Sequence, residues 1–204
     1  MSDSCADSCA AEALQQRQRG TLWAVLLINA IMFIVIAIAA IYGHSSSLLS
    51  DSLDNLGDAL TYILSLYAVS RGRQTKARVA MFKGGLIFLA ACVVAAEIIY
   101  KQFVPSMPVY EIMGAFSLLG LLANSLCLYL LWRHRNEDVN MSSVWECSRN
   151  DIAVNISVFI TAGAVWLTSS AWPDIIVAAC LVVMLMRSGL RVMLTAKKEM
   201  DGID

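Results

Sequence analysis

Long apolar stretches constrain the fold of this chain more than any other feature. A helix that crosses a bilayer needs roughly 20 mostly apolar residues, because the hydrocarbon core is about 30 Å thick and a helix rises about 1.5 Å per residue. Six stretches meet this requirement, at residues 22–42, 46–70, 79–101, 108–132, 144–168 and 172–194. None shows the alternation of a transmembrane strand. They predict an all-α integral membrane protein, a bundle of six transmembrane helices.

Composition points the same way. Hydrophobic residues make up 58% of the 204 residues and charged residues only 15%, against about 45–50% and about 25% in soluble domains. A single water-soluble core of this length cannot hide that excess, so the spare apolar surface must face lipid. The net charge of −1 gives no indication of a nucleic-acid partner.

Basic residues indicate the orientation. They precede the first stretch, cluster at the loops between the second and third and between the fourth and fifth, and mark the C-terminal end of the sixth, whereas Lys101 lies on the other side. The largest cluster lies at the loop between the second and third stretches and comprises Arg71, Arg73, Lys76, Arg78 and Lys83. The positive-inside rule then places both termini in the cytoplasm. The protein is expected in the cell (inner or plasma) membrane. The clusters are also expected to contact anionic lipid.

This topology divides the chain into three parts. Residues 1–20 form a cytoplasmic N-terminal tail with a cysteine pair, residues 21–195 form the six-helix transmembrane domain, and residues 196–204 form a short cytoplasmic tail.

Acidic residues interrupt the second apolar stretch. Asp51, Asp54 and Asp58 are three and four residues apart, so they share one face of a helix. Each costs roughly 2.5–3.5 kcal/mol at the centre of a membrane helix. Three carboxylates on one face therefore require a compensating partner.

The fifth stretch carries a second polar pair, Asp151 and Asn155, again four residues apart on one face. No lysine or arginine is expected to lie deep enough to neutralise these acids, which favours bound cations or protons as their partners. Two facing pairs supply four oxygen-bearing side chains, enough to enclose a small dication. Metal binding needs deprotonated carboxylates, so the same chemistry exchanges metal for protons. This interpretation requires the two sets to lie within about 10 Å of each other, since ligands lie about 2 Å from an ion.

Three motifs resemble the cation diffusion facilitator (cation efflux) family. The run from Ser50 to Asp58, SDSLDNLGD, is similar to the family's second-helix motif, in which an Asp precedes a His/Asp-x-x-x-Asp metal pair. The run from Asn150 to Asn155, NDIAVN, resembles the second pair in the fifth helix, and Trp172-Pro173-Asp174 resembles the Pro-Asp before the sixth. The resemblance covers about residues 20–195.

The resemblance implies an alternating-access exporter of divalent metal in exchange for protons, often a homodimer, and not an enzyme. It implies Asp54, Asp58 and Asp151 as metal ligands, with Asn155 as the fourth. Asn155 replaces the family's usual acid, which removes one titratable group. The family's cytoplasmic metal-sensing domain has no counterpart here, which puts dimerisation and regulation in doubt.

No cofactor is expected beyond the transported ion. An all-oxygen site suits manganese, iron(II) or cobalt, while zinc and cadmium remain open.

Six further residues are candidates for accessory roles. Asp51 lies on the face of the ligand pair, and Cys147 lies four residues before Asp151. Asn29 and Asn124 orient the carboxylates or join helices by hydrogen bonds. Cys5 and Cys9 form a C-x₃-C pair that either captures a soft metal or has no role.

Three other functions fit parts of this pattern. A membrane metal sensor or store would need the same ligands. A CDP-alcohol-type phosphotransferase also holds metal with membrane-embedded Asp residues, but the residues that should follow its second Asp are missing here. A proton-coupled drug exporter would be expected to surround one acid with aromatic residues.

Overall fold

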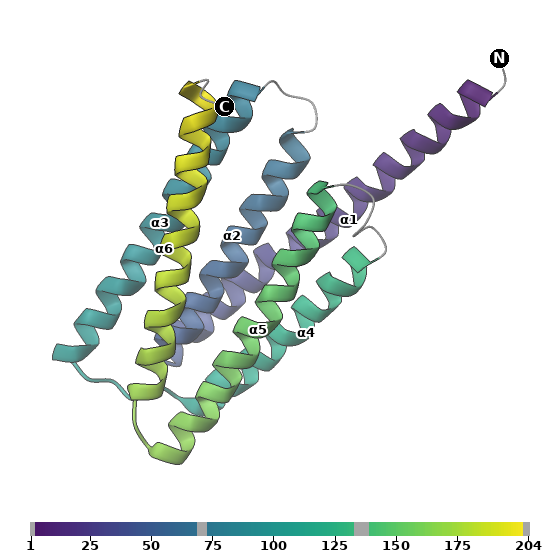
Figure 1. Ribbon diagram of the computed structural model, residues 1–204. Coiled ribbons are helices and arrows are strands. Elements are labelled where there is room, and N and C mark those ends of the chain that lie inside the picture. Colours follow the sequence, from purple (N-terminus) through teal and green to yellow (C-terminus); the bar gives the residue numbers. More distant parts are fainter. Residues whose placement is uncertain (1–2, 69–72, 133–138, 202–204) are drawn as a thin grey trace.

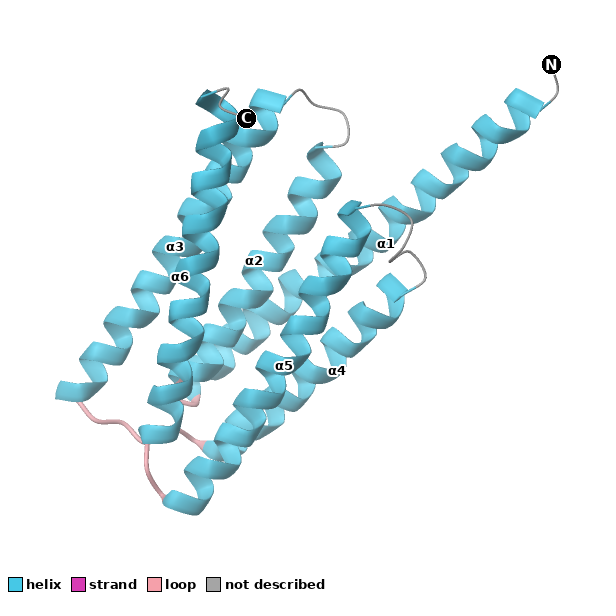
Figure 2. Ribbon diagram, in the orientation of Figure 1, coloured by secondary structure: helices cyan, strands magenta, loops and turns pink. Residues whose placement is uncertain are grey.

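The computed structural model describes residues 3–68, 73–132 and 139–201, and all of its regular structure in these ranges is helical (Figure 1, Figure 2). The helices are α1 (Asp3–Tyr42), α2 (Ser46–Ala68), α3 (Arg73–Phe103), α4 (Tyr110–Trp132), α5 (Val139–Thr168) and α6 (Trp172–Asp201). Their order and number agree with the six apolar stretches.

Successive helices run in alternating directions through one bundle (Figure 1). Helix α1 begins and α6 ends at the same end of the bundle, here called the terminal end. The opposite end, here called the turn end, holds the short loops between α1 and α2, α3 and α4, and α5 and α6 (Figure 2). The start of α1 and the end of α6 therefore lie on one side of the bundle.

Five helices are long and apolar enough to cross a membrane, namely α1, α3, α4, α5 and α6. Helix α2 is not among them. It carries Asp51, Asp54 and Asp58 together with several serines, which lower its hydropathy. The helix that bears the acids is thus the one that needs most shielding by its neighbours.

Several helices are longer than the apolar stretches within them. Helix α1 begins at Asp3, within the segment assigned to a tail, and α6 continues to Asp201. A helix of 30 residues such as α6 is about 45 Å long, so it extends beyond a hydrocarbon core of about 30 Å.

Close backbone contact joins α3 to α6. A Cβ on Gly84 would lie 2.9 Å from the carbonyl oxygen of Gly189, and a Cβ on Gly189 would lie 3.0 Å from the carbonyl oxygen of Gly84. Small residues of this kind let membrane helices approach closely. Large apolar side chains such as Leu27, Leu89 and Leu122 are more than half exposed on the outside of the bundle, where lipid would cover them.

Candidate functional site

The acids of α2 and α5 meet inside the bundle. The carboxyl groups of Asp58 and Asp151 are within hydrogen-bonding contact, across the interface between the two helices. The distance that the sequence interpretation requires is therefore met by this pair. Two carboxylates in contact repel one another unless a proton or a cation lies between them.

Two further side chains interact with Asp58. Tyr62 lies one helical turn further along α2 and its hydroxyl donates a 3.0 Å hydrogen bond to Asp58 Oδ2. Lys83 of α3 donates a hydrogen bond to Thr61 Oγ1, and its ammonium group lies near enough to attract the carboxylate of Asp58.

The position of Lys83 corrects the sequence interpretation. That interpretation placed Lys83 in the basic cluster at the loop, near the start of the third stretch, and expected no lysine or arginine to lie deep enough to neutralise the acids. Lys83 instead lies near enough to Asp58 to attract its carboxylate, almost three turns into α3, which begins at Arg73. From there, its four-carbon stem spans the gap to α2.

The other acids of α2 lie towards the turn end. Asp54 is half-buried, and Asp51 is 1% exposed with no hydrogen-bond partner for either carboxylate oxygen. Both interact electrostatically with Asp151, so all three acids of α2 face the same region, as their spacing predicts. Asp51 is the most enclosed of the three, since Asp58 is 8% exposed.

Asn155 lies one turn from Asp151 but its amide is directed to α4. Its Nδ2 donates to the backbone carbonyl of Asp151 at 2.9 Å, and its buried Oδ1 has no hydrogen-bond partner. That oxygen lies against Gly120, where an added Cβ would collide with it. In this conformation Asn155 is therefore held beside α4, and it reaches an ion shared with Asp58 only after its side chain rotates.

Cys127 of α4 is a residue near the acids that the sequence pattern did not single out. It is fully buried and close enough to Asp151 and Asp58 for their charges to act on its thiol. Asn29 of α1 is directed at it, with Nδ2 3.7 Å from the Cys127 sulfur and 2.9 Å from the Val25 carbonyl. Cys127 lies three residues after Asn124 on α4, and this spacing could have indicated that both residues share the helix face near the acids.

Asn124 is 2% exposed, and its amide nitrogen has no hydrogen-bond partner. The side chains of Cys5, Cys9 and Cys147 lie outside the described residues. Among the side chains that are described, no group of three or more His, Cys, Asp or Glu residues could together hold a metal ion as they stand. Asp58 and Asp151 are the acids of the two motifs that contact each other.

A second polar cluster closes the turn end. The buried carboxylate of Asp174 on α6 accepts hydrogen bonds from the backbone N–H groups of Ser46 and Ser47 and from the hydroxyls of Ser45 and Ser47, at 2.6 to 3.1 Å. It thereby caps the N-terminus of α2, where an acceptor and a negative charge are both favourable.

A neighbouring ion pair adds to this cluster. Lys101 and Glu97 of α3 are 3.0 Å apart, as their spacing predicts. Lys101 also donates to the carbonyl oxygen of His44 and to the Ser46 hydroxyl, both at 2.7 Å. The start of α2 is thus held by α3 and α6 together.

One family model matches the chain. Residues 22–200 match the model described as the cation efflux transmembrane domain, a range that includes α2 to α5 in full and most of α1 and α6. No significant match is found among curated proteins.

Proposed function

Since the chain belongs to the cation efflux family, we propose that it exports divalent metal cations through a site between α2 and α5. Family membership makes the chain a multi-pass membrane protein and a member of a cation transporter family, and it confirms the family resemblance seen in the sequence. The choice of divalent metals, the site and the coupling to protons belong to the proposal.

The contact between Asp58 and Asp151 is the observation that carries the proposal. It brings together one acid from each of the two motifs. Two carboxylates from different helices make a binding point that a change in helix packing opens or closes. A dication between them would replace their repulsion with attraction.

The remaining ligands are proposed from the register of the two helices. Helices α2 and α5 run in opposite directions (Figure 1). A step of one turn, about 5.4 Å, towards the turn end leads from Asp58 to Asp54 and from Asp151 to Asn155. We expect Asp54 and Asn155 to complete the shell by side-chain rotation. Their oxygens form a set suited to manganese, iron(II) or cobalt, with zinc and cadmium as alternatives.

Lys83 gives the site a cation of its own. Its ammonium attracts the Asp58 carboxylate, so an arriving dication must compete with it and with any proton shared by Asp58 and Asp151. Metal binding would therefore displace the Lys83 ammonium from Asp58 and release the shared proton. Release of that proton is the exchange that a metal/proton antiporter requires.

The membrane arrangement follows from the bundle. We propose that α2 is a sixth crossing, with its acids shielded by the neighbouring helices rather than exposed to lipid. The terminal end would then face the cytoplasm, in a cell (inner or plasma) membrane, since the basic residues of the described helices other than Lys101 lie in the terminal-end halves of those helices. A homodimer is compatible with the family, and lipid, protons and the transported ion are the other expected partners.

Transport into proteoliposomes tests the proposal. The protein should accumulate manganese, cobalt or zinc when a pH gradient is imposed, with proton movement in the opposite direction. Asp54→Ala and Asp58→Ala should abolish the flux while the protein still inserts. Full flux in both variants would refute the site. Metal binding by the wild type without any flux would instead favour a sensor or store.

A further inference from the structure

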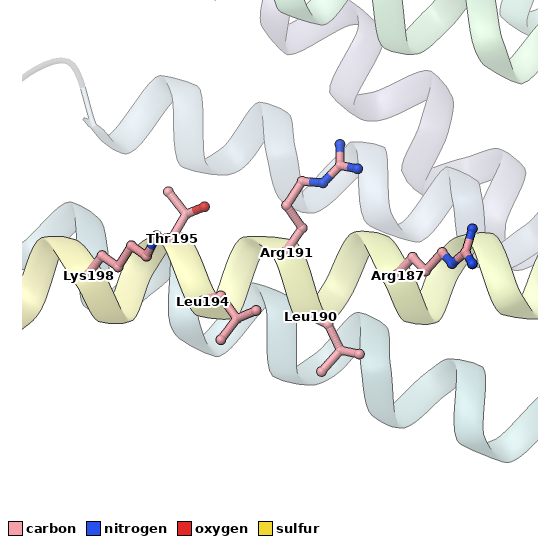
Figure 3. Close-up of a pocket in the computed structure, with 6 residues that line it drawn as sticks. All are labelled: Arg187, Leu190, Arg191, Leu194, Thr195 and Lys198. Atoms are coloured by element: carbon pink, nitrogen blue, oxygen red, sulfur yellow. The ribbon is translucent and has the colours of Figure 1, made fainter.

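The terminal-end half of α6 carries a basic groove that the proposed transport does not use. The groove has a volume of about 560 Å³ and is lined by Arg187, Leu190, Arg191, Leu194, Thr195 and Lys198 (Figure 3). All six side chains are exposed. Three of them are cationic and none is acidic, so the groove is a positively charged surface.

The position of the groove across the membrane decides which ligand can fill it. Measured from Trp172 at the turn end, Arg187 lies about 22 Å along α6, Arg191 about 28 Å and Lys198 about 39 Å, at about 1.5 Å per residue. If a hydrocarbon core of about 30 Å begins at Trp172, it ends near Arg191. Lys198 would then lie among the headgroups and Arg187 inside the apolar layer.

An exposed arginine at that depth needs an anionic or aqueous partner. Helical side chains lean towards the N-terminus of their helix, and Figure 3 shows the guanidinium of Arg187 displaced along α6 away from Arg191, which is that direction. Within the described part of the chain, Arg187, Arg191 and Lys198 form no ion pair or hydrogen bond. Their charges are therefore available to a ligand.

We propose that this groove binds the phosphate of an anionic lipid from the leaflet at the terminal end. Arg191 lies at the level of the phosphate, with Lys198 on its aqueous side and Arg187 on its apolar side. Guanidinium groups match phosphate oxygens through paired hydrogen bonds. Leu190 and Leu194, 43% and 61% exposed, supply an apolar surface beside them for the acyl chains.

The other leaflet offers a contrast. At the turn end, a groove of about 430 Å³ between α5 and α6 is lined by residues such as Thr161, Ala164, Trp172 and Val177, with no charged side chain among its lining residues. That groove suits acyl chains alone. Of these two grooves, only the one in the leaflet that positive-inside orientation makes cytoplasmic is charged, and anionic lipids attract basic segments there.

Lipid binding to the purified full-length protein tests the proposal. Dioleoylphosphatidylglycerol would be titrated into the protein in neutral detergent, with binding read by native mass spectrometry and by the rise in melting temperature. Arg191→Gln and Arg187→Gln should each weaken binding about tenfold or more, and Arg191→Lys should restore part of it. Lys197→Gln is the matched control, because Lys197 is exposed beside Lys198 but does not line the groove.

The outcomes separate the lipid from simpler explanations. Equal losses in Arg191→Gln and Lys197→Gln would indicate general charge attraction and overturn the site. Displacement of the lipid by millimolar inorganic phosphate would overturn the lipid assignment in favour of a free anion. Zwitterionic dioleoylphosphatidylcholine should bind no better to the wild type than to Arg191→Gln. None of these measurements depends on metal transport.

Discussion

Asp58 of α2 and Asp151 of α5 bring their carboxyl groups into hydrogen-bonding contact inside the bundle. The two acids come from separate motifs, and each motif pairs its acid with an oxygen-bearing side chain one turn away. Around them lie a tyrosine hydroxyl, a lysine ammonium and a buried thiol. The candidate site therefore lies between α2 and α5, and the ammonium of Lys83 supplies a positive charge beside its acids.

Only glycine at position 120 is expected to leave space for the amide oxygen of Asn155. In Gly120→Ala, the new Cβ would collide with Asn155 Oδ1, and such overpacking typically costs about 1–3 kcal/mol. The melting temperature in detergent should fall, and adding Asn155→Ala should restore it. Gly163→Ala is the control, because a Cβ there meets nothing within 4 Å. Equal stability of Gly120→Ala and Gly163→Ala would show that Asn155 is not held there.

Replacing Lys83 should strengthen metal binding. Lys83→Met removes the charge that attracts Asp58, and a unit charge about 4 Å away is worth roughly 1–4 kcal/mol in a partly buried site. The dissociation constant for manganese should fall about tenfold or more, measured by equilibrium dialysis. Lys101→Met removes a lysine that is instead paired with Glu97 and should leave the constant unchanged. Weaker binding in Lys83→Met would mean that the lysine organises the site.

The apolar stretches were enough to predict the number, order and helical character of the elements. The spacing of Asp51, Asp54 and Asp58 also predicted their common face, because helical periodicity is a local property. What escaped prediction depends on neighbours. The reach of Lys83 to α2 depends on where α3 begins, and the direction of the Asn155 amide depends on the space that Gly120 leaves on another helix.

Asp174 is expected to stabilise the bundle by capping α2. Asp174→Ala leaves the N–H groups of Ser46 and Ser47 without their acceptor, and buried unpaired donors cost about 1–3 kcal/mol. Thermal unfolding should shift down, and Asp174→Asn, which keeps one acceptor oxygen, should lie between that variant and the wild type. An unchanged melting temperature in Asp174→Ala would rule out the cap as a stabilising contact.

Asn155→Asp should keep transport and alter its coupling. The change restores the acid that is usual for the family and adds one titratable group to the proposed ligand set. Flux in proteoliposomes should persist with a steeper dependence on the pH gradient, or with a different preference among metals. If the variant failed to fold, the amide would be a packing residue and not a ligand.

Metal binding by the purified protein tests the central claim most directly. Free manganese can be counted by electron paramagnetic resonance during a titration of the wild type, Asp58→Asn, Asp151→Asn and the double variant. Glu97→Gln serves as the control, since Glu97 pairs with Lys101 at the turn end. We predict one high-affinity ion per chain, lost in either single variant and weakened no further in the double variant. Undiminished binding in both single variants would contradict a cation shared by the two helices.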